Sequence, residues 1–126
     1  MRLFACERGN AAVEFSLVAP LFISLLLGVV EFGRYHWIQN GLRFAVEEAG
    51  RFAIANSSAS AETIAGKVLA KAPSTGTAPV IDVQASSSGG MNFITIQAST
   101  DFSFLMPFLP IGPLPIASRT TVPVGS

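Results

Sequence analysis

The sequence predicts an α+β fold. A long N-terminal transmembrane helix continues into a small domain with a short second helix and a small antiparallel sheet of about three strands. A largely apolar run without a charged residue occupies residues 15–30. Apolar residues then recur at three- and four-residue steps to residue 52, which is helical spacing. The C-terminal half alternates apolar with polar residues between clusters of Gly, Pro and Ser, which is typical of strands.

The apolar run is the candidate membrane span. Residues 15–30 fall slightly short of the roughly 20 apolar residues that cross a bilayer core. Adding residues 11–13 and 32–33 completes the span, with Glu14 and Glu31 near its two ends. Glu31 is expected to pair with Arg34, three residues further along the helix, as an exposed ion pair that contributes only a few tenths of a kcal/mol. Because a carboxylate at that depth is costly unless it is paired or neutralised, such a residue indicates a function.

Composition and charge limit what the rest of the chain can do. The 126 residues have a formal net charge of zero, so no clustered basic face for nucleic acid is expected. Arg2 and Arg8 favour a cytoplasmic N-terminus, although Arg34 and Arg43 beyond the span leave charge alone ambiguous. The single cysteine, Cys6, precedes the span, and we expect neither a disulfide nor a cysteine-based metal site.

One continuous helix is expected over residues 11–55, about 65 Å long at 1.5 Å per residue. Pro20 removes a backbone donor inside it and is expected to kink it. The sequence Asn-Ser-Ser at 56–58 ends this helix, and Ser60 is placed to cap a second one over residues 61–72. The outer half of the long helix carries an apolar stripe on which the sheet should dock: Tyr35, Ile38, Leu42, Ala45, Ala49 and Phe52. The second helix should bury Ile64, Val68 and Leu69.

Three strands are expected, over residues 80–84, 92–99 and 117–124, with SSSGG at 86–90 as a flexible hairpin joint. Between the last two strands, residues 101–115 are rich in Phe, Leu and Pro, which predicts an irregular loop or edge. Exposed apolar patches of this kind mark partner or membrane contacts. The alternative is that the loop folds back onto the long helix as core. Both alternatives apply to Phe102, Phe104, Phe108 and Leu109.

The residues at the start of the span carry a family resemblance. A short basic leader is followed by Gly9, and Glu14 is the fifth residue after that glycine, at the opening of the hydrophobic helix. This arrangement resembles type IV pilin-like precursors. The sequence segments RGNAAVEFSLVAPLF and EFGR are similar to those of the TadE-like pseudopilins of tight-adherence (Flp-type) pili. The similarity is dense over residues 8–51 and looser in DFSFLMPFLPIGPLPIASRTTV near the C-terminus.

The resemblance implies a minor pilin or pseudopilin that a prepilin peptidase cuts after Gly9. Residues 1–9 would then be a leader, 10–33 the transmembrane part of the helix and 34–126 an extracytoplasmic domain. The protein would be single-pass in the inner membrane, with a cytoplasmic N-terminus, and would be available for incorporation into the pilus. The expected partners are the peptidase, other pilin or pseudopilin subunits, the inner-membrane pilus assembly platform and the lipid bilayer.

Glu14 has two interpretations. The resemblance implies that it pairs with the amine created at Asn10 of the same or a neighbouring subunit, which would neutralise a charge that membrane burial penalises. The alternative is an interfacial carboxylate that meets water among the head groups. At the other end of the span, Tyr35 and Trp37 are expected to form an aromatic belt at the membrane interface.

No enzyme, cofactor or metal site is predicted. A nucleophilic serine needs a base and an orienting acid, and the chain has one histidine, His36, which cannot build a metal site alone. The alternative function is an uncut, bitopic envelope protein with a small binding or sensing domain. A third interpretation, a membrane-tethered hydrolase, would need an essential residue among His36, Asp82 and Asp101.

Overall fold

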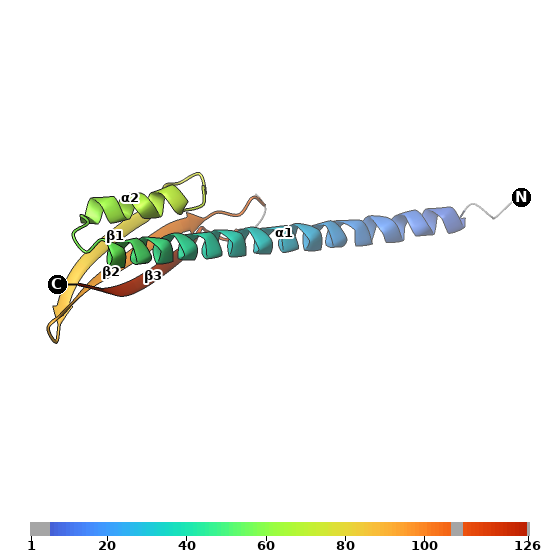
Figure 1. The fold of residues 1–126 in the computed structure, drawn as a ribbon. Helices are drawn as coiled ribbons and strands as arrows, with labels where there is room; N and C mark the ends of the chain where they lie inside the picture. The colour runs from blue at the N-terminus through green and yellow to red at the C-terminus, as the bar shows by residue number, and fades with distance from the viewer. Residues whose placement is uncertain (1–5, 107–109, 126) are drawn as a thin grey trace, which may run out of the picture. The chain divides into compact units, whose positions relative to one another are not determined.

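The structure, a computed structural model, describes residues 6–106 and 110–125 and confirms the predicted α+β class (Figure 1). In chain order the elements are α1 (Cys6–Ala55), α2 (Ala61–Lys71), β1 (Val80–Ser88), β2 (Met91–Phe102) and β3 (Leu114–Val124). The chain divides into two compact units, Met1–Arg34 and Tyr35–Ser126, with the boundary inside α1. The second unit therefore holds the C-terminal part of α1 together with α2 and the sheet.

Helix α1 ends at Ala55, as predicted, and begins at Cys6, ahead of the expected residue 11. It continues through Pro20, whose carbonyl oxygen accepts a hydrogen bond from Ser24 Oγ at 2.7 Å. The kink expected at this proline stays a prediction. At the other end, Asn56 donates both its backbone N–H and its side-chain amide to the carbonyl of Phe52, at 2.9 and 3.1 Å. These bonds satisfy a carbonyl that the helix end leaves without an intrahelical partner.

Helix α2 begins where the capping signal predicted. The Ser60 side chain accepts a hydrogen bond from the backbone N–H of Thr63 at 3.2 Å, which satisfies one of the free donors of the first turn. Ile64 and Val68 are buried, as expected. The expectation for Leu69 was wrong, because its side chain is 51% exposed. One residue beyond Val68 the helix has turned by about 100°, which carries Leu69 off the buried face.

The sheet is antiparallel, in the order β1-β2-β3. Its three strands are longer than predicted: β2 and β3 extend toward each other up to the pair Phe102–Leu114, and β1 is longer because the first hairpin is tighter than the SSSGG composition suggested. The three serines of that segment belong to β1, and the turn consists of Gly89 and Gly90 alone, between the paired residues Ser88 and Met91. Both glycines have positive φ, 60° and 79°, a conformation that the favoured two-residue hairpin turns require.

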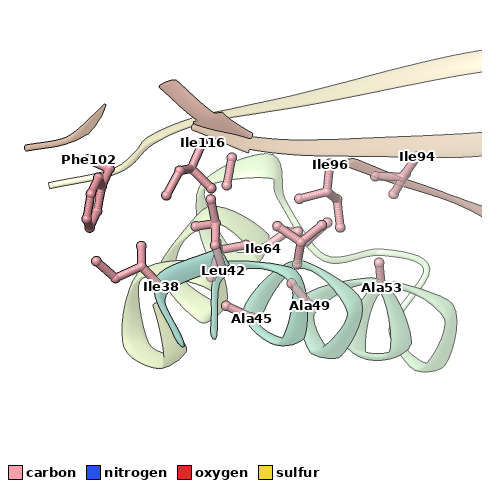
Figure 2. Packing of buried hydrophobic residues seen from close by; sticks show 13 residues of the cluster. Ile38, Leu42, Ala45, Ala49, Ala53, Ile64, Ile94, Ile96, Phe102 and Ile116 are labelled. Atoms are coloured by element: carbon pink, nitrogen blue, oxygen red, sulfur yellow. The ribbon is translucent and has the colours of Figure 1, made fainter. Parts of the chain in front are cut away.

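The core of the second unit lies between the sheet and the two helices. Figure 2 shows Ile38, Leu42, Ala45, Ala49 and Ala53 of α1 facing strand residues that include Ile94, Ile96 and Ile116. The predicted stripe is thereby confirmed, with Tyr35 and Phe52 partly buried at its margins. The prediction missed Val46 and Ala53, which are fully buried beside it.

Helix α1 approaches β3 closely at Gly50. A Cβ added to this glycine would lie 3.1 Å from Val122 Cγ1 and 3.2 Å from Thr120 Cγ2. These distances are shorter than ordinary van der Waals contacts between carbon atoms, which lie near 3.5–4.0 Å. The missing side chain therefore allows the helix backbone to sit directly on the sheet.

Candidate functional site

The first unit presents apolar side chains on every side of α1. From Val13 to Phe32 its large hydrophobic residues are all exposed, as is usual only for a helix surrounded by apolar material. Among the described residues, α1 is the helix long and apolar enough, by length and composition, to cross a membrane. Its most apolar window has a mean hydropathy of 2.3, and none of that window is buried within the protein.

No packing contact in the described part of the chain accounts for Gly9. A Cβ built on it meets nothing within 4 Å, and its φ is not positive. It lies inside α1, where glycine is about 1 kcal/mol less favourable than alanine. The protein's own packing and backbone conformation therefore do not explain why this position carries a glycine.

The structure brings the next two predicted site residues together. Asn10 and Glu14 lie one helical turn apart, and the Asn10 side-chain amide donates to Glu14 Oε1, with an Nδ2–Oε1 distance of 3.3 Å. Both residues are exposed, so their polar groups remain available to other molecules. The bond forms because helical residues four apart stack on one face.

Glu31, at the far end of the apolar run, is more buried than expected. The ion pair with Arg34 is confirmed, with Arg34 Nη1 2.9 Å from Glu31 Oε2. The expectation that this pair is exposed was wrong, because Glu31 is only 6% exposed. A buried carboxylate that loses its cation is destabilising by several kcal/mol in typical cases, whereas an exposed pair contributes little. Sequence spacing identified the pair but gave no measure of its burial.

The two aromatic residues expected at the membrane interface point in different directions. Tyr35 is partly buried and packs edge-to-face on Phe102, with ring centroids 5.5 Å apart. Trp37 is 63% exposed. Tyr35 and Trp37 are two positions apart in α1, so their side chains differ by about 200° around the helix axis. The two rings therefore face different surroundings. Trp37 is therefore the one with a free surface to offer an interface.

For four residues a partner surface and a core position were both left open, and the structure places Phe102 in the core. Its side chain is 1% exposed and belongs to the core, which was the alternative left open for it. Phe104 is partly buried and stacks edge-to-face on Phe102, with ring centroids 5.2 Å apart. Phe108 and Leu109 lie outside the described residues.

The three residues considered for a hydrolase lie on three different elements, His36 on α1, Asp82 on β1 and Asp101 on β2. Asp82 pairs in register with Gln97, four positions along β2 from Asp101, and its carboxylate accepts a hydrogen bond from Gln84 at 2.7 Å. His36 lies on α1 beside Tyr35. Across residues 6–106 and 110–125, no group of three or more His, Cys, Asp or Glu side chains is arranged to hold a metal ion.

Comparison with known proteins finds a family model that matches the N-terminal stretch of the chain. Residues 9–51 match the family model described as TadE-like protein. No curated protein and no solved structure matched the chain. The matched range begins at Gly9 and includes Glu14, and it ends within the part of α1 that packs on the sheet. From Gly9 to Arg51 the chain is therefore similar to TadE-like proteins, as the sequence resemblance predicted.

Proposed function

We propose that this protein is a minor pilin or pseudopilin of a tight-adherence pilus system, and that a prepilin peptidase cuts it between Gly9 and Asn10. The TadE-like match supports the association with such a pilus. The observation that carries the cleavage site is the position of Gly9, five residues before Glu14 at the opening of the apolar helix, where the described packing does not require a glycine. A peptidase whose active site excludes a side chain at the cut supplies the missing reason.

Cleavage would change the electrostatics around Glu14 in one step. The new N-terminus would place a positive amine on Asn10, one turn from the carboxylate that its side chain already contacts. The helix would then start at residue 10, where four backbone N–H groups lack intrahelical acceptors and the helix dipole is positive. Each change places positive charge close to the Glu14 carboxylate. The carboxylate is then neutralised by an amine of the same or a neighbouring subunit, which removes its cost inside the membrane.

The location follows from the same helix. Residues 10–33 would span the inner membrane with the N-terminus in the cytoplasm, and residues 34–126 would form the extracytoplasmic domain. Apolar helices have little hydrophobic reason to pair while both are in lipid, so packing and polar contacts must select partner subunits. Glu14 is the polar contact available for this selection. The assembly platform and other pilin-like subunits are the proposed partners.

Intact mass spectrometry of the full chain, made with and without the peptidase, tests the proposal. We expect the peptidase to remove residues 1–9 from the wild type and to leave Gly9→Val uncut. Ala12→Val is the control, since it places the same valine side chain at another exposed helix position and should be cut normally. A wild-type chain that keeps residues 1–9 in cells assembling fibres would show instead an uncut membrane anchor.

A further inference from the structure

Pro20 leaves one backbone carbonyl of α1 without its usual partner. In an α-helix each carbonyl accepts a hydrogen bond from the N–H four residues further on. The carbonyl of Ser16 would need the N–H of residue 20, and proline has none. Because α1 continues as a single helix from Cys6 to Ala55, the chain does not avoid this loss by ending the helix at Pro20.

Side chains near this carbonyl do not replace the missing donor. The Ser16 hydroxyl donates to the carbonyl of Val13, and the Ser24 hydroxyl donates to the carbonyl of Pro20, each at 2.7 Å. These two hydroxyls are the side-chain donors of the apolar run, residues 15–30. Within residues 6–106 and 110–125, no side-chain donor is bonded to the Ser16 carbonyl. Its oxygen is therefore an open acceptor.

An open acceptor is costly where this one would lie, a step that rests on the membrane span given under the proposed function. Ser16 is six residues beyond residue 10, about 9 Å along a helix, and the hydrocarbon core is about 30 Å thick. In that core neither water nor lipid tails can donate to a backbone carbonyl. Proline is tolerated in membrane helices because neighbouring helices supply bonds of this kind.

The Ser16 carbonyl can be reached from outside the helix. Both Ser16 and Pro20 are exposed. A helical carbonyl lies on the surface between its own side chain and those three and four residues further on, which here belong to Ala19 and Pro20. All three side chains are small, so the side chain of another helix can approach the oxygen.

We propose that the Ser16 carbonyl accepts a hydrogen bond from a side-chain amide, of Asn or Gln, on a transmembrane helix of another polypeptide. A hydroxyl fits less well, since Ser and Thr on a helix bond their own backbone, as Ser16 and Ser24 do. A second copy of this chain lacks the donor, because residues 11–33 contain no amide side chain. Asn10 is about 9 Å nearer the membrane edge and already donates to Glu14.

Carbonyl NMR of the full chain in phosphatidylcholine vesicles tests this acceptor. Serine labelled with ¹³C at the carbonyl and leucine labelled with ¹⁵N select the Ser–Leu peptide bonds, which are Ser16–Leu17 and Ser24–Leu25. Ser24 is the matched control, because residue 28 of the same helix is a glycine and keeps its N–H. Pro20→Ala restores the donor to Ser16 and thereby assigns its resonance.

The probe is a polyleucine transmembrane helix with one Asn at the depth of Ser16, compared with the same helix bearing leucine there. Because a hydrogen bond deshields a carbonyl carbon, we expect the Ser16 signal to lie upfield of the Ser24 signal before the probe is added. The Asn helix should move the Ser16 signal downfield and leave Ser24 in place. The all-leucine helix should move neither signal, and Pro20→Ala should respond to neither helix.

Three results would overturn the inference. A Ser16 signal that already coincides with Ser24 without the probe would show that the carbonyl is satisfied. Equal shifts with the two host helices would assign the change to packing alone. A downfield shift that grows with protein density, without any probe, would make a second copy the donor.

Amide exchange of Leu17 and Leu25 separates these results from failure of the proposed function. A helix that lies in water without tertiary packing exchanges its amides rapidly. Rapid exchange at both leucines would therefore remove the membrane span itself. Slow exchange together with a Ser16 signal that the Asn helix does not move would leave the span in place and overturn only the hydrogen bond.

Discussion

Gly50 of α1 lies so close to Val122 of β3 that the two residues leave no room for a larger side chain. A Cβ on the glycine would stand 3.1 Å from Val122 Cγ1. We expect Gly50→Val to lower the free energy of unfolding by about 1–3 kcal/mol, the typical cost of overpacking. The gain in helix propensity on replacing glycine, a few tenths of a kcal/mol for valine, is too small to offset this cost.

The same substitution at Gly66 is the control for Gly50→Val. Gly66 lies inside α2, and a Cβ there meets nothing within 4 Å. Gly66→Val should therefore leave stability unchanged or slightly raised. Thermal unfolding of both full-length variants in detergent, followed by circular dichroism, measures the difference. Equal midpoints for the two variants would contradict the close packing of α1 on β3.

The main elements were predictable because each carries its own local signal. The helical stripe from Ile38 to Ala49, the Ser60 cap and the alternation in β2 are properties of neighbouring residues, and the structure confirms all three. The ends of the strands were harder to predict from the sequence. Serines 86–88 have a low strand propensity of their own, but they belong to β1 because they pair with β2 across the Gly89–Gly90 turn. Tertiary pairing decided that boundary.

Phe102 should be the most sensitive position at the Tyr35 end of the domain. Its ring is 1% exposed and contacts the rings of Tyr35 and Phe104. Because truncation removes buried apolar surface and leaves a cavity, Phe102→Ala should cost about 3–5 kcal/mol. Leu105→Ala, at a side chain that is 71% exposed, should stay within about 0.5 kcal/mol of the wild type. Chemical denaturation of the full chain in detergent gives both values, and similar costs would contradict the core assignment.

The cap of α2 gives a smaller and more local prediction. Ser60→Ala removes the acceptor for the Thr63 backbone N–H and should destabilise α2 by about 1 kcal/mol, whereas Ser60→Asp keeps an acceptor and should cost little. Hydrogen exchange of the amides in α2 measures the effect. We expect faster exchange in Ser60→Ala alone. Faster exchange in both variants would point to a role of the serine other than capping.

The candidate site was only partly accessible to sequence reasoning. Spacing placed Asn10 and Glu14 on one face of a helix and Glu31 beside Arg34, and the structure shows both contacts. Burial is a property of the folded chain, so the enclosure of Glu31 could not be read from its neighbours. Phe102 shows the same limit, because the Phe-, Leu- and Pro-rich composition of its segment suits a surface patch as well as a core.

Glu14 supports a prediction that separates charge from hydrogen bonding. Glu14→Ala should still insert into the membrane but assemble poorly, because the subunit loses the counter-charge for the amine proposed at Asn10. Glu14→Gln keeps an oxygen that can accept from the Asn10 side chain at the present 3.3 Å, yet it carries no charge. If neutralisation of the amine drives assembly, both variants should fail alike. Glu48→Ala, which removes an exposed carboxylate elsewhere on α1, is the control and should assemble normally.

Membrane fractionation measures the insertion of each Glu14 variant, and the yield of fibres sheared from cells measures its assembly. We expect the wild type and Glu48→Ala to give fibres, and both Glu14 variants to give membrane-bound subunits without them. Recovery of fibres by Glu14→Gln alone would show that a neutral hydrogen bond, rather than a charge pair, selects the partner subunits during assembly. Full assembly by Glu14→Ala would remove Glu14 from the assembly step altogether, since no acceptor would then remain at that position to contact a neighbouring amine.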